Sequence, residues 1–226
     1  MFEGVLLDFY GTVVHEDGHI IAEVCDRILE TATEPANAAD VGNYWWNVFA
    51  AGFTGSHGDR FETQRELEWR SLASTVDRFG ASCNPGVLAL KLFDQWQSPE
   101  LFEDGAEFLE TVDLPVAVVS NIDRDDIEAA ISLRGLQIEH VVTSEDVRSY
   151  KPRPELFAAG LAALDLAADR VLHVGDSIAS DVVGANRLGI PVAWVNRSGK
   201  PQPTDVSIAY TVSRLTDLLP VLLAGR

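Results

Sequence analysis

Short apolar runs alternate with segments of helical periodicity along most of the chain. The first run, Gly4–Asp8, has the continuous apolar character of a strand that is buried on both faces. Strands that alternate with helices indicate βαβ units, in which helices cover both faces of a parallel sheet. The pattern therefore predicts an α/β fold with a Rossmann-like parallel sheet flanked by helices. The other predicted strands are Pro115–Val119, Ile138–Val142, Arg170–Val174 and Pro191–Val195, and the predicted helices are Asp123–Leu133, Pro154–Leu164, Ile178–Leu188 and Ser213–Leu223.

The stretch from 15 to 97 departs from this alternation. It contains no clear strand, and its apolar residues recur at helical spacing. The segment Ala51–Arg60 is rich in Gly, His and Asp, which predicts a loop between two helices. We therefore predict an all-helical insertion at 15–97, set into an α/β body that consists of residues 1–14 and 98–226.

The composition is that of a globular protein with a strong excess of acid. Of 226 residues, 46% are hydrophobic and 23% are charged, and 35 acidic against 17 basic residues give a net charge of −18. Nonspecific nucleic-acid binding needs a basic face, and an anionic membrane repels an acidic protein. We therefore expect no nucleic-acid or membrane partner and a small-molecule substrate. If that substrate is an anion, it needs a locally positive site.

The number of cysteines and the N-terminal residues indicate the cellular compartment in which we expect the protein. Two cysteines, Cys25 and Cys83, are too few for a disulfide framework and do not have a metal-binding spacing. The first residues lack the basic start and apolar core of a signal peptide, and no apolar run reaches the roughly 18 residues of a membrane span. We expect a cytoplasmic protein.

Polar residues follow the predicted strands at their carboxyl ends, where ligands bind in open α/β sheets. Taken singly, each of them also fits a structural role as a strand-ending turn, a helix N-cap or an acid at a helix start. Two carboxylates that lie close together also fit a Mg²⁺ site. These residues are Asp8 after the first strand, Ser120 and Asn121 after the second, and Asp176 after the fourth, with Asp181 five residues further on.

A lysine lies in a stiff loop before a predicted helix. Lys151 is followed by Pro152 and Pro154, and a rigid loop suits a lysine with a fixed electrostatic task, although a solvated surface lysine is the commoner case. The order of the acid, Ser-Asn, Lys-Pro and Gly-Asp segments resembles that of the haloacid dehalogenase (HAD) superfamily of hydrolases. The resemblance covers about residues 1–14 and 98–226. The helical insertion is similar in position to the C1 cap of phosphoglycolate-phosphatase-like and 2-haloacid-dehalogenase-like members.

The resemblance implies a hydrolase in which Asp8 is the nucleophile and forms a covalent ester that water then hydrolyses. A carboxylate nucleophile replaces one difficult displacement by two easier steps. By the same resemblance to phosphatase members, the metal ligands are Asp8, the Tyr10 carbonyl and Asp176, with Asp181 holding a metal-bound water or orienting Lys151. The groups expected to surround the phosphoryl oxygens are Lys151, Gly11, Thr12, Ser120 and Asn121.

Tyr10 departs from the phosphatase pattern. Family phosphatases usually carry a second Asp at this position, which protonates the leaving alcohol and then activates water. Tyrosine within D-x-Y-G-T resembles the 2-haloacid dehalogenases, in which the leaving halide needs no proton. Those enzymes look Mg²⁺-independent, lack the Gly-Asp pair that this chain keeps at Gly175-Asp176, and carry an early cap Arg. This chain has no Arg or Lys between Ala32 and Arg60.

We therefore predict a Mg²⁺-dependent phosphatase that acts on a small phosphate monoester through an aspartyl-phosphate on Asp8, with Tyr10 and Lys151 as further catalytic residues. Two alternatives stay open. One is a carbon-centred hydrolase like the 2-haloacid dehalogenases, which cleaves a C–halogen or C–N bond. The other is a catalytically weakened HAD domain that serves as a binding module. We interpret His173 as a core histidine, and the roles of His57, Arg60 and the loop Asn196–Gly199 are open.

Overall fold

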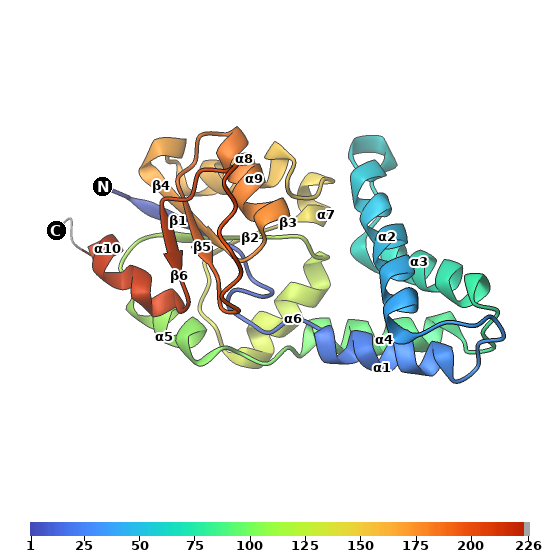
Figure 1. Cartoon of the computed structure of the whole chain (residues 1–226). Coiled ribbons are helices and arrows are strands. Elements are labelled where there is room, and N and C mark those ends of the chain that lie inside the picture. Colours follow the sequence, from blue (N-terminus) through green and yellow to red (C-terminus); the bar gives the residue numbers. More distant parts are fainter. Residues whose placement is uncertain (224–226) are drawn as a thin grey trace. The chain divides into compact units, whose positions relative to one another are not determined.

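The computed structural model describes residues 1–223, which form two compact units (Figure 1). The sheet unit contains Met1–Glu16, Glu100–Asn121 and the described residues from Arg134 onward. The helical unit contains Asp17–Pro99 and Ile122–Leu133. Within residues 1–223, every helix is too short or too polar to span a bilayer.

Six parallel strands form the sheet, in the order β3-β2-β1-β4-β5-β6. The central strand β1 pairs on one side with β2 (Leu7 beside Val118) and on the other with β4 (Leu7 beside Val174). Val5, Leu6 and Leu7 are fully buried, as expected for a strand with helices on both faces. The strands are β1 (Gly4–Leu7), β2 (Val116–Ser120), β3 (His140–Thr143), β4 (Val171–Gly175), β5 (Val192–Val195) and β6 (Tyr210–Val212).

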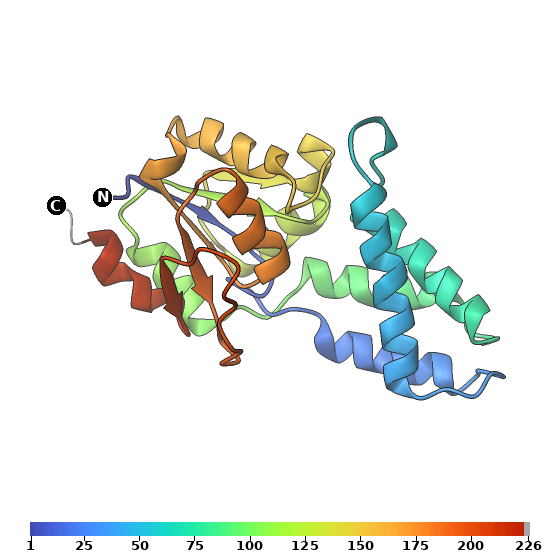
Figure 2. The same ribbon diagram turned by 45° about the horizontal axis from the view of Figure 1, so that its top comes forward.

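Helices cover both faces of this sheet. α8 (Pro154–Leu164) packs on β1, β2 and β3, while α5 (Glu103–Thr111) and α10 (Leu219–Leu223) lie on the opposite side (Figure 2). Gly160 lets α8 approach the sheet closely, because a Cβ at this position would lie 2.7 Å from the Val119 side chain. The other helical elements of this unit are α7 (Ser144–Val147), the π-helical turn η3 (Ile178–Val182), α9 (Val183–Arg187), and the 3₁₀ turns η2 (Ala168–Arg170) and η4 (Leu215–Leu218).

The predicted α/β fold class is confirmed, and each of the five predicted strands is present within two residues of its expected bounds. β6 was not predicted, because it is a three-residue edge strand without a continuous apolar run. The predicted helix Ser213–Leu223 is wrong in its first half, where the chain forms the 3₁₀ turn η4 before α10. Pro220 has no N–H and fits only the first turn of a helix, so the α-helix begins there.

Four helices make up most of the helical unit, and side chains cap the N-termini of three of them. Asn37 and Asp40 form a reciprocal capping box at the start of α2, and Thr63 and Glu66 form another at α3. Such caps satisfy backbone N–H groups that have no partner within the helix. The helices are α1 (Gly18–Leu29), α2 (Ala38–Gly55), α3 (Gln64–Arg78) and α4 (Pro85–Gln97).

The predicted loop Ala51–Arg60 is wrong in its first half, because α2 continues to Gly55. Gly52 lies against α3, and a Cβ at this position would be 2.8 Å from the Leu67 side chain. The glycine lets the two helices pack closely, and this packing outweighs the low helix propensity of glycine. Arg60 then lies in the short 3₁₀ turn η1 (Gly58–Arg60).

The start of α6 (Arg124–Arg134) is bound to the start of α3. The buried carboxylate of Asp123 accepts hydrogen bonds from the first two backbone N–H groups of α3, at 2.7 and 2.9 Å. Asp126, one turn further along, pairs with the guanidinium of Arg65. These contacts explain why this segment belongs to the helical unit, although the sequence places it between β2 and β3.

Glu68 is a buried acid in the helical unit, only 4% exposed. Its carboxyl group accepts a hydrogen bond from the Trp45 indole N–H at 2.8 Å. Burial raises the pKa of Glu68 to about 8, and the hydrogen bond from Trp45 offsets this only in part. At neutral pH the carboxyl group is therefore mostly protonated, and ionising it destabilises the fold.

We expect Glu68→Gln to stabilise the protein at alkaline pH. The pKa of Glu68 is higher in the folded than in the unfolded chain, so wild-type stability is lost as pH rises from about 4.5 through about 8. Gln does not titrate, so at pH 9 its free energy of unfolding should exceed that of the wild type by on the order of 5 kcal/mol. Urea unfolding at pH 5 and pH 9 measures this difference. A variant that gains nothing between these two pH values would contradict the prediction.

Candidate active site

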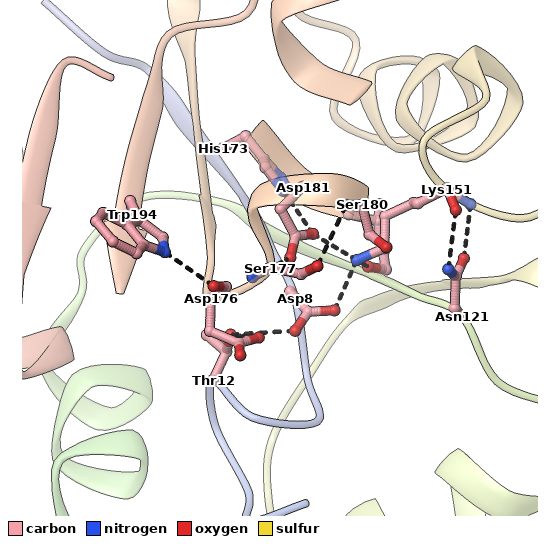
Figure 3. Close-up of polar contacts among 11 residues, drawn as sticks. Asp8, Thr12, Asn121, Lys151, His173, Asp176, Ser177, Ser180, Asp181 and Trp194 are labelled. Carbon is pink, nitrogen blue, oxygen red and sulfur yellow. Dashed lines mark hydrogen bonds and ion pairs between the residues drawn. The ribbon is translucent and has the colours of Figure 1, made fainter. Parts of the chain in front are cut away.

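The loops that follow β1 and β4 converge at one edge of the sheet with the loop before α8 (Figure 3). The first of these loops carries Asp8, the second carries Asp176, and the third carries Lys151. The carboxyl ends of parallel strands share one edge of an open sheet. Segments that are far apart in the sequence therefore bring the predicted residues together.

Asp8 lies directly after β1 and is 6% exposed. One of its carboxylate oxygens, Oδ1, accepts a hydrogen bond from the Lys151 ammonium at 2.6 Å. The other, Oδ2, accepts one from the Thr12 hydroxyl at 3.1 Å. Burial raises the pKa of Asp8, while the positive charge of Lys151 works in the opposite direction. Both oxygens are thus held in fixed directions.

Lys151 is 4% exposed, and its ammonium has three acceptors. They are Asp8 Oδ1 at 2.6 Å, Asp181 Oδ1 at 2.7 Å and the Val119 carbonyl at 2.9 Å. Burial alone would lower the pKa of Lys151, but the carboxylates of Asp181 and Asp8 raise it above its ordinary value. The lysine is therefore a fixed positive charge at the site and not a solvated surface residue.

Asp181 orients this lysine and is itself held by two further groups. Its Oδ1 lies 3.0 Å from His173 Nε2, and its Oδ2 accepts the Ser177 backbone N–H at 3.0 Å. Burial alone would raise the pKa of Asp181, but Lys151 and the hydrogen bond to His173 lower it, so the side chain stays ionised. His173 is fully buried, as expected for a core histidine, yet it contacts the site through Asp181.

Asp176 is the third carboxylate of the site. Among the described residues, Lys151 pairs with Asp8 and Asp181 and not with Asp176. The Asp176 Oδ1 lies 3.5 Å from the Thr12 hydroxyl. Burial, together with the negative charges of Asp8 and Asp181, raises the pKa of Asp176 to about 8. Gly11, at φ +84°, makes room for this carboxyl group, because a Cβ there would lie 2.8 Å from it.

The donor set of this cluster fits a hard divalent cation. Oxygen atoms of Asp8, Asp176 and Asp181 lie within 4.8 Å of one another, and Lys151 contacts two of these carboxylates, those of Asp8 and Asp181. Carboxylate oxygens are the ligands that Mg²⁺ prefers, and it usually keeps several waters. A cation would also relieve the repulsion that raises the pKa of Asp176. The predicted Mg²⁺ site is therefore compatible with the residues present.

The polar residues after β2 take different positions. Ser120 is buried at the end of β2. The Asn121 side chain bonds the backbone of Lys151 twice: its Oδ1 accepts the Lys151 N–H at 2.7 Å, and its Nδ2 donates to the Lys151 carbonyl at 3.2 Å. In this structure Asn121 thus positions the lysine loop.

The turn after Asp8 places the other predicted groups. The Gly11 N–H, which was expected near the phosphoryl oxygens, donates to the Val14 carbonyl at 2.7 Å. Glycine is needed at this position because φ is positive and because the Asp176 side chain lies close to it. The Thr12 hydroxyl is directed at Asp8. Tyr10 is half-buried, and its ring packs edge-on against Phe9 with 5.2 Å between the centroids.

One contact at the site involves a residue that the sequence did not single out. The Trp194 indole N–H donates to the Asp176 carbonyl at 2.9 Å. Trp194 lies in β5 beside Gly175 of β4. The contact depends on the register between β4 and β5, and no short sequence motif predicts that register.

The sequence and the fold are similar to those of known hydrolases. A family model described as haloacid dehalogenase-like hydrolase matches residues 2–189. The (S)-2-haloacid dehalogenase H-109 of Pseudomonas putida is 24% identical over 219 residues, 87% of each chain. Pyrophosphatase PpaX of Bacillus mycoides is 28% identical over 164 residues, 67% of this chain and 75% of PpaX. The structure of L-2-haloacid dehalogenase from Xanthobacter autotrophicus covers 100% of both chains with a TM-score of 0.77 and 21% identity.

These comparisons confirm the predicted superfamily and a hydrolase, and they leave the finer function open. They do not support the predicted preference for phosphate monoesters, because the names of the relatives favour the haloacid dehalogenase alternative. Some relatives are pyrophosphatases, so phosphorus chemistry also occurs among them. The family match spans most of the chain, and the chain belongs to the haloacid dehalogenase-like hydrolases.

Proposed function

We propose that this hydrolase is a Mg²⁺-dependent phosphatase of small phosphate monoesters, with Asp8 as the nucleophile. The observation that carries the proposal is the cluster of Asp8, Asp176 and Asp181 beside a single lysine. When all three carboxyl groups are ionised, they and the one ammonium sum to a charge of −2, and burial and the repulsion among them raise the pKa of Asp176 to about 8. Such a site repels a phosphate ester or a haloacid anion unless a cation is added, and Mg²⁺ would supply it.

The residues of the site fall into two groups, those that would hold the metal and those that orient Lys151. Asp8, Asp176 and the Tyr10 carbonyl would hold Mg²⁺, which when bound neutralises charge on the phosphoryl oxygens. Asp181 already accepts hydrogen bonds from Lys151, His173 and Ser177. We therefore assign Asp181 to orienting the lysine, which is one of the two roles expected for it.

The chain's own groups then act in two steps. The Asp8 carboxylate attacks phosphorus, the bond to the leaving oxygen breaks, and the leaving oxygen takes up a proton from water or from the Tyr10 hydroxyl, which water then reprotonates. Water next attacks the aspartyl-phosphate, which releases phosphate and restores Asp8. Lys151, 2.6 Å from Asp8, stabilises the negative charge of the transferring group, and Thr12 fixes the other Asp8 oxygen.

Tyr10 limits the rate of this chemistry. A phenol has an ordinary pKa near 10, so at neutral pH it can donate a hydrogen bond to a leaving oxygen but is a poor base for water. Loss of a positioned acid–base group typically lowers the rate by about 10² to 10⁴. We therefore expect slow turnover that is tolerable for aryl or acyl phosphates and poor for alkyl phosphates.

Tyr10→Asp should raise kcat for alkyl phosphates by about tenfold or more, since it restores a carboxyl group and leaves the backbone carbonyl in place. Tyr10→Phe is the matched control, because it keeps the ring and removes the hydroxyl. Steady-state phosphate release with paired alkyl and aryl esters measures the effect. If Tyr10→Asp lowers turnover, or if the wild type hydrolyses both ester classes equally well, the proton transfer belongs to another residue.

A carbon-centred hydrolase is the second candidate function. Tyr10 within D-x-Y-G-T favours it, and so do the dehalogenase names among the relatives. In that reaction Asp8 displaces halide from carbon, and the leaving halide needs no proton. The carboxylate of Asp176 argues against the carbon-centred hydrolase, because a third carboxylate at the site does not help to bind an anionic haloacid.

A substrate panel separates these functions. Phosphate monoesters and 2-haloacids are offered to the wild-type protein, each with Mg²⁺ and with chelator, while phosphate and halide release are measured. We expect phosphate release that requires Mg²⁺. Halide release that persists in chelator would establish the dehalogenase function instead. A protein that binds Mg²⁺ and turns over neither class would be a binding module.

A further inference from the structure

Arg197, in the loop after β5, contacts several segments of the sheet unit through its two terminal nitrogens, while its buried Nε has no hydrogen-bond partner among the described residues. Its Nη1 lies 3.0 Å from each carboxylate oxygen of Asp104, and its Nη2 donates to the Thr12 carbonyl at 2.8 Å. The guanidinium carbon lies 3.8 Å from the centroid of the Phe102 ring. The side chain is only about one-fifth exposed. These contacts involve segments on both sides of the helical insertion in the sequence.

The segments that Arg197 contacts are already joined to one another. Entering and leaving the insertion, the chain pairs antiparallel: the His15 N–H donates to the Glu100 carbonyl at 2.7 Å, and the Phe102 N–H to the Val13 carbonyl at 3.0 Å. The rings of His15 and Phe102 also pack together, with 3.7 Å between their centroids. Arg197 thus contacts the paired segment next to the nucleophile turn.

Asp104 anchors the guanidinium from the other side. It is buried, and besides Arg197 it accepts the Leu215 backbone N–H at 2.6 Å. Both Asp104 oxygens lie 3.0 Å from the same Arg197 nitrogen, Nη1, and this charge-assisted contact together with the Phe102 ring holds the guanidinium in place. The second Arg197 nitrogen is therefore presented to the Thr12 carbonyl in a fixed direction.

Thr12 connects this arginine to the nucleophile. The residue is fully buried, its carbonyl accepts from Arg197, and its hydroxyl donates to Asp8 Oδ2 at 3.1 Å. The same hydroxyl lies 3.5 Å from Asp176 Oδ1. A shift of the Thr12 backbone would therefore move the hydroxyl that orients the attacking carboxylate.

We propose that Arg197 is a positioning residue, which fixes the Thr12 backbone and through it the orientation of the Asp8 carboxylate. The proposal rests on the proposed function only in that Asp8 is the nucleophile, and it holds for phosphorus and for carbon as the centre attacked. Lysine cannot replace the arginine, because it lacks a planar guanidinium. That group contacts Asp104 with one nitrogen, donates to Thr12 with another and stacks on Phe102.

A double-mutant cycle tests this connection, with whichever substrate the wild type turns over. Arg197→Lys should lower kcat by about tenfold or more and change KM by less than about threefold, because geometry at the nucleophile is lost while substrate binding remains. In a Thr12→Val background, which lacks the hydroxyl, the same change should lower kcat by less than about threefold. In Thr12→Ser, which keeps the hydroxyl, the full effect should return.

The control is Arg170→Lys, at an exposed ion pair with Glu3, which should leave kcat unchanged. Equal effects of Arg197→Lys in the wild type and in Thr12→Val would overturn the proposal and indicate a purely structural role. Crystal structures of the wild type and of Arg197→Lys provide a test that needs no turnover. The contact of 3.1 Å between the Thr12 hydroxyl and Asp8 should be lost in the variant. If it is unchanged there, Arg197 does not position Asp8, whatever the substrate proves to be.

Discussion

Asp8→Asn should reduce turnover by at least about a thousandfold, because an amide cannot act as the nucleophile that forms the covalent intermediate. Asparagine has nearly the same shape, and its side-chain oxygen can still accept a hydrogen bond from Lys151 or Thr12, so the fold should be kept. Burst and steady-state product release measure the loss, and circular dichroism checks the fold.

The matched control is Asp165→Asn. Asp165 lies at the C-terminal end of α8 in a left-handed conformation that asparagine also adopts readily. This end of α8 lies by the start of β1, away from the carboxyl edge of the sheet, since Leu164 and Leu166 are the neighbours of Gly4. The control should retain full activity. An Asp8→Asn variant that keeps a tenth of wild-type turnover would remove Asp8 from the role of nucleophile.

The second large effect concerns Asp176 and the metal. Chelation should reduce wild-type activity to background, and added Mg²⁺ should restore it. Asp176→Asn keeps a side-chain oxygen but removes the negative charge of an expected ligand. We therefore expect Mg²⁺ affinity to fall by at least about 10- to 100-fold, the typical cost of losing a group that supports a ligand, with a matching loss of turnover at limiting Mg²⁺. Isothermal titration with Mg²⁺ measures the affinity, and full turnover of the wild type in chelator would contradict the assignment.

The same substitution should have the opposite effect on stability in chelator. The pKa of Asp176 is raised to about 8 in the folded chain, so the metal-free protein loses stability as pH rises from about 4 through about 8. Asp176→Asn removes this charge and should raise the melting temperature at pH 9, with little change at pH 4. A melting temperature that falls at pH 9 would show that repulsion among the carboxylates does not act at this site.

The sheet and the edge that carries the site were predictable, because they follow from local patterns. Continuous apolar runs mark buried strands, and Asp8 and Asp176 follow such runs directly. For Lys151 the stiff loop left a fixed electrostatic task and a solvated surface position both open, the resemblance implied the former, and the structure buries the ammonium between two carboxylates.

Contacts between segments that are distant in the sequence were not predictable in the same way. The contact of Trp194 with Asp176 depends on strand register, and that of Arg197 with Thr12 on how a loop after β5 folds back. The interpretation of His173 as a core residue captured its burial but not its contact with Asp181. Each of these residues occurs singly, without a motif, so only the folded chain shows its partner.

Hydrolysis in ¹⁸O-labelled water tests the central claim most directly, because phosphorus and carbon chemistry place the label differently. Water attacks phosphorus in an aspartyl-phosphate but attacks the carboxyl carbon of Asp8 in an alkyl ester. The measurement is mass spectrometry of the released product and of the peptide that contains Asp8 after many turnovers. Our account predicts ¹⁸O in the released phosphate and an unlabelled Asp8. Label in the Asp8 carboxylate would contradict it and establish attack on carbon.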